Sequence, residues 1–221
     1  MSPASEADRD LVAPDSGAEP TLERSRRIVE AAYELLGEAG LEGLTIRAVL
    51  KKTGLSRRAF YERFAGKDEL MLAVFERTIG MAAEHFGEQI KVLPDPLRRL
   101  ELIVTHISLG TRVSGSDNET SDRRGAAMSR EHLRLAESHP AALQAALRPL
   151  LDLIAQQLSA GMAAGLVRHG AAPRLATLVY NLVSTTVHTE LLSRETALPD
   201  PPGRLRQAAD LWEFCRRAIA A

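Results

Sequence analysis

The stretch LTIRAVLKKTGLSRRAFYERF, residues 44–64, decides the fold of the region around it. It has the pattern of two short helices joined by a tight turn. Thr45 and Ser56 are of the residue types that cap helices, because a side-chain oxygen accepts an otherwise unpaired backbone N–H of the first turn. Gly54 lies between them and supplies the positive φ that a sharp turn needs. The pattern predicts a helix-turn-helix unit.

Apolar spacing divides the second short helix into a buried and an exposed face. Leu55 and Phe60 occupy the two positions of a hydrophobic staple around the Ser56 cap. Phe60 and Phe64 are four residues apart and therefore share one face, which we expect to face the core. The other face is left to solvent, and it carries Arg57, Arg58, Tyr61, Glu62 and Arg63.

The formal net charge of −1, from 28 basic and 29 acidic residues, hides an uneven distribution. Residues 44–67 hold seven basic residues and one acidic residue, a net charge of +6, whereas residues 1–21 carry −4. Nucleic-acid binding leaves such a basic footprint. A helix-turn-helix unit places its second helix in the major groove, where arginine bonds to guanine in a bidentate manner. The sequence therefore predicts a DNA-binding surface at residues 44–67.

Helical periodicity continues through almost all of the remaining chain, with apolar residues recurring every three or four positions and no alternation of period two to compete. A single cysteine excludes an internal disulfide and a cysteine-based zinc site. We predict an all-α fold in which an N-terminal three-helix unit joins a larger helical region. The predicted helices cover residues 22–39, 45–52, 57–63, 68–91, 97–112, 124–137, 140–167, 172–193 and 203–219.

Breaks and termini complete this organisation. Pro94 and Pro96 mark the boundary between two helical regions, and residues 198–203 (LPDPPG) break the chain before the last helix. Residues 114–124 are polar, and we predict a mobile loop there. Residues 1–20 are acidic and rich in Pro, Ala and Ser, without the basic start and apolar core of a secretory signal. They predict a disordered tail on a cytoplasmic protein.

Residues 22–75 resemble the DNA-binding signature of TetR/AcrR-type transcriptional regulators, because the apolar, glycine, aromatic and lysine positions all match that signature. That signature is roughly T-hydrophobic-R-x-I-A-x-x-A-G-V-S-x-x-x-F-Y-x-x-F-x-x-K-x-x-L, and this chain has TIRAVLKKTGLSRRAFYERFAGKDEL. Two positions depart from it: Leu50 replaces the usual Ala, and Ala48 replaces a common acidic residue. We expect the larger Leu50 side chain to alter how the two short helices pack.

The resemblance implies a role for each matching residue. Thr45, Tyr61 and Lys67 match positions that usually touch the DNA backbone, while recognition-helix positions that reach bases fall at residues 57–59. Phosphate contacts position a protein on DNA without reading its sequence, so base choice should rest on few residues. The predicted DNA-binding set is Thr45, Arg47, Ser56, Arg57, Arg58, Ala59, Tyr61, Arg63 and Lys67.

Several of these residues have an alternative interpretation. Arg57 and Arg58 are also compatible with solvated charges at a helix start, and Tyr61 with a cover over the edge of the core. Glu62 opposes phosphate binding. It either reads a cytosine amino group or forms a salt bridge with a neighbouring basic residue, the candidates being Arg58, Lys51 and Lys52.

The resemblance divides the chain into the tail (1–20), a helix-turn-helix DNA-binding domain (21–67) and a helical ligand-binding and dimerisation domain (68–221). A dimer also has a physical reason, since one short helix reads only a few base pairs and two copies about 34 Å apart read a palindrome. The resemblance places the interface on the last two helices. Candidate interface residues, with membership of the core as the alternative, are Leu178, Leu182, Leu211 and Trp212.

The central helices of such proteins enclose a ligand cavity. Few charges line the apolar faces here, so a largely hydrophobic ligand is expected. His106 is equally compatible with a hydrogen-bonded core residue, and the spacing of His132 and His139 does not fit a metal site. The candidate cavity residues are His106, Met128, Met162 and Tyr180. No cofactor or metal is predicted.

These patterns predict a homodimeric, sequence-specific regulator of transcription, a repressor that a small ligand releases from a palindromic operator. One alternative is an all-α enzyme or carrier, but the sequence has no nucleophile elbow, phosphate-binding loop, dinucleotide-binding turn or metal motif. Another is a helical interaction protein that has lost DNA binding. No membrane partner is predicted, because the longest charge-free stretches have 15 residues and a spanning helix needs about 20.

Overall fold

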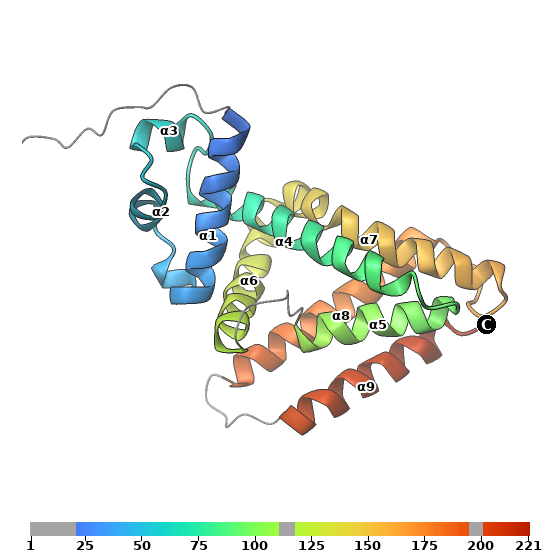
Figure 1. Cartoon of the computed structure of the whole chain (residues 1–221). Helices are drawn as coiled ribbons and strands as arrows, with labels where there is room; N and C mark the ends of the chain where they lie inside the picture. Colours follow the sequence, from blue (N-terminus) through green and yellow to red (C-terminus); the bar gives the residue numbers. More distant parts are fainter. Residues whose placement is uncertain (1–20, 111–117, 195–200) are drawn as a thin grey trace, which may run out of the picture.

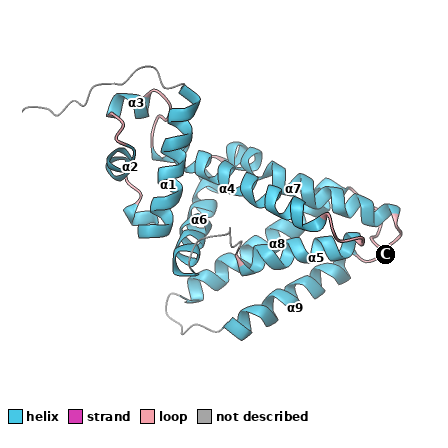
Figure 2. Cartoon of the chain, in the orientation of Figure 1, coloured by secondary structure: helices cyan, strands magenta, loops and turns pink. Residues whose placement is uncertain are grey.

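The computed structural model describes residues 21–110, 118–194 and 201–221, and their regular structure is helical (Figures 1 and 2). A single isolated bridge pairs Val167 with Ala220. The predicted all-α fold is thereby confirmed. The helices are α1 (Thr21–Gly43), α2 (Ile46–Thr53), α3 (Arg57–Tyr61), α4 (Lys67–Ile90), α5 (Pro96–Leu109), α6 (Asn118–Ser138), α7 (Pro140–Ala163), α8 (Ala172–Arg194) and α9 (Pro201–Ile219).

Helices α1, α2 and α3 form a small lobe, and the capping residues begin its two short helices as predicted. The Thr45 hydroxyl accepts a hydrogen bond from the Ala48 N–H at 3.1 Å, and the Ser56 hydroxyl accepts one from the Ala59 N–H at 3.2 Å. Gly54 closes α2 in the left-handed region, with φ of 70°. Local sequence therefore determines both helix starts and the turn between them.

The core of the small lobe fills the space between α1 and the two short helices. Phe60 is fully buried and Phe64 nearly so, and their ring centroids lie 5.7 Å apart. On α1, Ile28 and Leu36 are also fully buried. Leu50 is half-buried against this core, so the larger side chain is accommodated at its edge. Burial of one face of α3 holds its other face toward solvent.

Helices α4 to α9 form a large lobe, in which α7 packs against α4, α5 and α8, and α5 also packs against α8 and α9 (Figure 1). The large lobe has its own buried apolar centre, built around side chains such as Phe86, Leu100, Ile103 and Ile154. None of the helices in the described part of the chain is long and apolar enough to span a bilayer.

Two helices of the large lobe hold the small lobe in place. Helix α6 lies along α1, and α4 also contacts α1 (Figure 1). Arg123 of α6 donates to the carbonyl oxygens of Gly37 and Glu38, at 3.3 and 2.5 Å. Arg77 of α4 forms an ion pair with Glu30 of α1. The small lobe is therefore positioned by side chains that come from two separate helices.

Several helix ends differ from the prediction. Helix α1 runs on to Gly43 through a kink at Gly40, which has φ of 65°, so the predicted end lies at a bend. Helix α6 begins at Asn118, well before the predicted start at 124, because Arg123 gains its partners on α1. Helix α7 ends at Ala163 rather than 167, since the chain turns at Gly165 with φ of 69°.

Residues 118–124 were predicted to belong to a mobile loop, but the structure shows them as helix. Residues 111–117 lie outside the described residues. Helix α3 also ends earlier than predicted, at Tyr61, and α5 ends at Leu109. The predicted tail at residues 1–20 and residues 198–200 of the predicted break lie outside the described residues as well, whereas residues 201–203 of that break belong to α9.

Substitution of Gly54 by Ala should destabilise the protein by about 1–2 kcal/mol, the cost of a left-handed backbone for an L-residue. Nothing lies within 4 Å of a Cβ at this position, so the effect isolates the backbone term. The measurement is urea unfolding followed by circular dichroism.

Gly66→Ala is the matched control, because Gly66 is equally open but has extended backbone with φ of 179°. We expect that variant to be as stable as the wild type. Equal losses of stability in the two variants would contradict the attribution of the Gly54 effect to its left-handed backbone.

Candidate functional site

Helix α3 presents the predicted recognition residues to solvent. Arg57 and Arg58 are exposed at its N-terminal end, and Tyr61 is 54 % exposed, while Phe60 between them is fully buried. The alternative in which Tyr61 covers the core edge fits only in part: its ring meets the Phe60 ring edge-on at 5.4 Å, yet half of the side chain faces water. The helix therefore offers two arginines and a phenol on one open surface.

The partner of Glu62 is Arg58, one of the three basic residues considered. The Arg58 Nε lies 2.9 Å from Glu62 Oε1 on the surface of the helix. Such an exposed pair contributes at most about 1 kcal/mol, so it opens easily. In this structure Arg58 is thus oriented along α3 by Glu62, whereas the neighbouring Arg57 has no carboxylate partner among the described residues.

Lys52 differs from the other basic residues of the 44–67 stretch. Its Nζ lies 2.6 Å from Glu38 and 3.1 Å from Glu34, both on α1. These two carboxylates raise the pKa of Lys52, with the hydrogen bond to Glu38 as the main cause. Lys52 therefore joins α2 to α1, and its charge is already compensated within the small lobe.

The remaining predicted DNA-binding residues lie around the same surface. Arg63 donates from Nε to the Ser25 hydroxyl of α1 at 2.6 Å, and Lys67 Nζ lies 3.4 Å from the Leu41 carbonyl oxygen. Ala59 and Lys67 are half-buried. The other seven are exposed: Thr45, Arg47, Ser56, Arg57, Arg58, Tyr61 and Arg63. The fold thus brings the predicted set onto one lobe.

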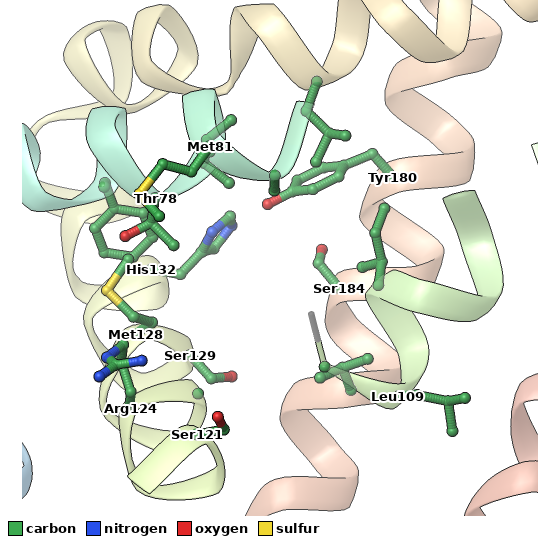
Figure 3. A pocket seen from close by; sticks show the side chains of 18 of the residues that line it. Thr78, Met81, Leu109, Ser121, Arg124, Met128, Ser129, His132, Tyr180 and Ser184 are labelled. Carbon is green, nitrogen blue, oxygen red and sulfur yellow. The ribbon is translucent and has the colours of Figure 1, made fainter. Parts of the chain in front are cut away.

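A cavity of about 230 Å³ lies in the large lobe, enclosed mainly by α4, α5, α6 and α8 (Figure 3). Its wall is mostly apolar. Met128 and Tyr180 line it, as predicted from the sequence. Tyr33 of the small lobe also lines it, so a helix of the helix-turn-helix lobe forms part of the cavity wall.

The structure does not place His106 and Met162 among the residues that line this cavity. The His106 Nδ1 lies 2.8 Å from the Leu102 carbonyl oxygen on its own helix, and its ring packs 5.8 Å from Phe86. It is the hydrogen-bonded core histidine that the alternative described. Met162 packs against the core near the end of α7.

Sequence reasoning missed most polar groups of the cavity wall, which Figure 3 shows on three helices: α4, α6 and α8. The spacing of the four on α6 is i, i+3, i+8 and i+11, the signature of a single helix face. This signal was present but ambiguous, because polar residues at helical spacing also suit a solvated face. The missed polar residues are Thr78, Ser121, Arg124, Ser129, His132 and Ser184.

His132 lies at the centre of this polar group. Its ring centroid is 6.1 Å from both the Phe75 and the Tyr180 rings. Burial lowers the pKa of His132 below its ordinary value of 6.5, and nearby His188 lowers it further, so the imidazole is neutral at pH 7. Burial raises the pKa of Tyr180, whose hydroxyl points into the cavity (Figure 3). The wall therefore offers neutral hydrogen-bonding groups.

A second hollow of about 180 Å³ adjoins the first and shares residues such as Gly125 and Val187 with it. Arg204 of α9 lines this hollow, donates to the Leu109 carbonyl oxygen at 2.6 Å and lies 3.5 Å from Asp122. Within the described residues no group of three or more His, Cys, Asp and Glu side chains is arranged to hold a metal ion.

Helices α8 and α9 carry exposed apolar side chains. Leu178 is 56 % exposed and Leu182 is 36 % exposed, as an interface would require. Leu211 and Trp212 are only 8 % exposed and belong to the core of the protomer, so their assignment to an interface surface is corrected. Sequence reasoning missed Leu205 and Phe214, exposed by 60 and 62 %.

Comparison with known proteins shows what this chain is similar to. Residues 28–74 match the family model described as bacterial regulatory proteins, tetR family. A fatty acid metabolism regulator protein of Bacillus subtilis is 22 % identical over 169 residues, covering 76 % of this chain and 83 % of the relative.

Solved structures share the fold over nearly the whole chain. A TetR-family transcriptional regulator of Pectobacterium atrosepticum superposes with a TM-score of 0.69 at 15 % identity, over 91 % of this chain and 96 % of that chain. FadR of Bacillus subtilis in complex with stearoyl-CoA superposes with a TM-score of 0.59 at 16 % identity, over 88 % of this chain and 98 % of that chain. RolR in complex with resorcinol superposes with a TM-score of 0.63 at 18 % identity, over 91 % of this chain and 97 % of that chain.

Residues 28–74 therefore match a TetR-type DNA-binding segment, and the chain as a whole has the fold of the TetR-family regulator structures.

The neutral state of buried His132 predicts a loss of stability in acid. A histidine whose pKa is lower in the folded than in the unfolded state takes up its proton on unfolding, so the free energy of unfolding falls as the pH drops below about 6.5. His132→Gln should flatten this fall between pH 7 and pH 5.5. Urea unfolding at each pH measures it.

His169→Gln is the control, because His169 is exposed in the folded protein, and its slope should equal that of the wild type. A wild-type slope in the His132 variant would contradict the prediction.

Proposed function

We propose that this chain is a homodimeric repressor that binds a palindromic operator and leaves it when a small, largely apolar ligand fills the cavity of the large lobe. One observation carries the proposal: the lobe that presents Arg57 and Arg58 also supplies Tyr33 to the cavity wall. Ligand and DNA would thus contact two sides of the same small domain. A ligand shifts the equilibrium between DNA-competent and incompetent states only by its differential affinity for them.

Roles on the DNA-binding surface follow from position. Arg57 and Arg58 project from the start of α3 and are proposed to read base edges, together with the half-buried Ala59. Thr45, Arg47, Ser56, Tyr61, Arg63 and Lys67 surround that helix start and are proposed to contact the phosphate backbone. Residues 21–67 would form the DNA-binding domain, and residues 68–221 the ligand-binding and dimerisation domain.

The exposed apolar side chains of α8 and α9 support the proposed dimer. Four large side chains on these two helices are exposed by 36–62 %. Leu178 and Leu182 are four residues apart on α8 and therefore share one face, and exposed apolar surface of this kind marks an interaction site. A second copy of the same face would bury it and would pair two recognition helices for the two halves of a palindrome.

The size of the cavity suggests the size of the ligand. At about 230 Å³ it lies just below the range of roughly 300–1,000 Å³ that is usual for drug-sized ligands. Resorcinol, which RolR holds, is a ring of comparable scale, whereas the stearoyl-CoA held by FadR is far larger. We therefore propose a compact ligand with an apolar body.

Replacing Arg57 by Ala should change sequence preference, with a loss of about 1–3 kcal/mol at the base pair it reads. Lys67→Ala should instead weaken binding to all sequences alike and reduce the salt slope by about one unit, as expected for a phosphate contact. Fluorescence anisotropy, on an operator selected from fragments of the source genome at several salt concentrations, measures both effects.

Arg98→Ala is the control, since Arg98 is an exposed arginine on α5 paired with Glu101, away from the small lobe. It should leave affinity and slope unchanged. If the protein bound no DNA fragment in a salt-dependent manner, the proposed function would be refuted. If the Lys67 variant changed its DNA sequence preference, the assignment of Lys67 to a phosphate contact would be wrong.

Replacing Leu178 by Glu should convert the dimer to monomers, because the proposed interface would bury an unpaired carboxylate. Val92→Glu is the matched control, since Val92 is 84 % exposed but lies between α4 and α5. Sedimentation velocity distinguishes the two states. A dimeric Leu178 variant, or a wild type that sediments as a monomer, would contradict the proposed interface.

A further inference from the structure

Tyr33 of α1 lines the cavity, and two arginines of the large lobe lie over its ring. The Arg124 guanidinium of α6 lies over the Tyr33 ring, 3.9 Å from its centroid. It also donates from Nε to the Tyr33 carbonyl oxygen and from Nη1 to the Tyr33 hydroxyl, both at 3.1 Å. Arg77 of α4 covers the ring at 5.8 Å. Tyr33 is thus held from both helices that attach the small lobe.

Arg124 belongs to the cavity as well as to this contact. It lines the cavity together with Tyr33, and Figure 3 shows it on α6 beside Met128, with its guanidinium turned away from Tyr180. One side chain thus joins the cavity wall to α1. A ligand group that binds this guanidinium through Nε or Nη1 competes with the Tyr33 oxygen atoms for those donors.

The charges around Arg124 favour an anion there. Its guanidinium donates to a neutral carbonyl and a neutral phenol, and no carboxylate among the described residues forms an ion pair with it. The other charged residue of the wall is Asp122, which is exposed and lies 3.5 Å from Arg204. A guanidinium beside an apolar wall binds a carboxylate through short, charge-assisted hydrogen bonds.

The contact between α1 and α6 leaves little room for adjustment. A Cβ placed on Gly37 would come within 2.5 Å of both Arg124 Nη2 and Thr120 Cγ2. Close-packed contacts of this kind respond to a displaced side chain by shifting as units. Movement of Arg124 toward the cavity would therefore disturb the position of α1, which carries the recognition helix.

We propose that the ligand of this cavity is an amphipathic carboxylate, and that its head group draws Arg124 away from Tyr33 and so loosens the small lobe. The inference deepens the proposed function and rests on it for the link to DNA. It names the chemical class of the ligand and the residue pair that transmits its binding.

The test measures ligand binding to the full chain by isothermal titration calorimetry, without DNA. The probes are octanoate and benzoate, each compared with its neutral alcohol, octan-1-ol and benzyl alcohol. At least one carboxylate should bind about tenfold more tightly than its alcohol, the scale of one charge-assisted hydrogen bond. Arg124→Gln should abolish that preference while leaving alcohol binding within about threefold, because the apolar wall is unchanged.

Tyr33→Phe provides a second variant with the opposite expected sign. It keeps the ring but removes the hydroxyl that accepts from Arg124, so the carboxylate should bind about threefold to tenfold more tightly. Arg123→Gln is the matched control, since Arg123 also joins α6 to α1 but does not line the cavity. It should bind the carboxylate as the wild type does. Circular dichroism confirms the fold of each variant.

Failure of both carboxylates to bind, equal binding of acids and alcohols, or a Tyr33 variant with weakened binding would each overturn the inference. DNA binding is measured separately by anisotropy on the selected operator. A chain that binds carboxylates through Arg124 but no DNA would refute the proposed function alone. A chain that binds DNA but prefers no carboxylate would refute the inference alone.

Discussion

The double packing of α1 is the constraint on which the rest of the structure depends. One face of this helix, with Ile28, Ala31 and Leu36, closes the core over Phe60 and so holds α3 outward. The opposite face, with Tyr33 and the Gly37 carbonyl, lies against α6. A single helix therefore connects the proposed DNA-facing surface with the wall of the cavity.

Charge on the small lobe is organised by the same helix. Seven basic residues between 44 and 67 suggest an evenly basic surface, but Glu34 and Glu38 of α1 compensate Lys52, and Glu62 pairs with Arg58. Among the described residues, Arg47 and Arg57 are exposed and form no ion pair with a carboxylate, so the positive charge is unevenly distributed over the stretch. This arrangement suits a protein whose DNA contacts must be confined to one edge of a small domain.

The sequence predicted the elements well and the cavity poorly, for a physical reason. Helix caps such as Thr45 and Ser56, and the turn at Gly54, depend on interactions within a few residues, so a local pattern predicts them. The start of α6 depends on Arg123 reaching α1, some 85 residues earlier in the chain, and local polarity gave the wrong expectation. His106 and Met162 show the same limit, because both are apolar-face residues of helices whose neighbours the sequence does not reveal.

Sequence alone determined that this chain is helical, that it carries a capped helix-turn-helix with exposed arginines, and that it resembles TetR-type regulators. Each of these conclusions rests on spacing within one segment, where short-range hydrogen bonds and one-sided burial leave few alternatives. Only the tertiary structure decided that Trp212 is core, that Lys52 is compensated, and that Arg124 joins the cavity to Tyr33. These outcomes depend on which helices become neighbours, and that choice is made by packing among segments far apart in the chain.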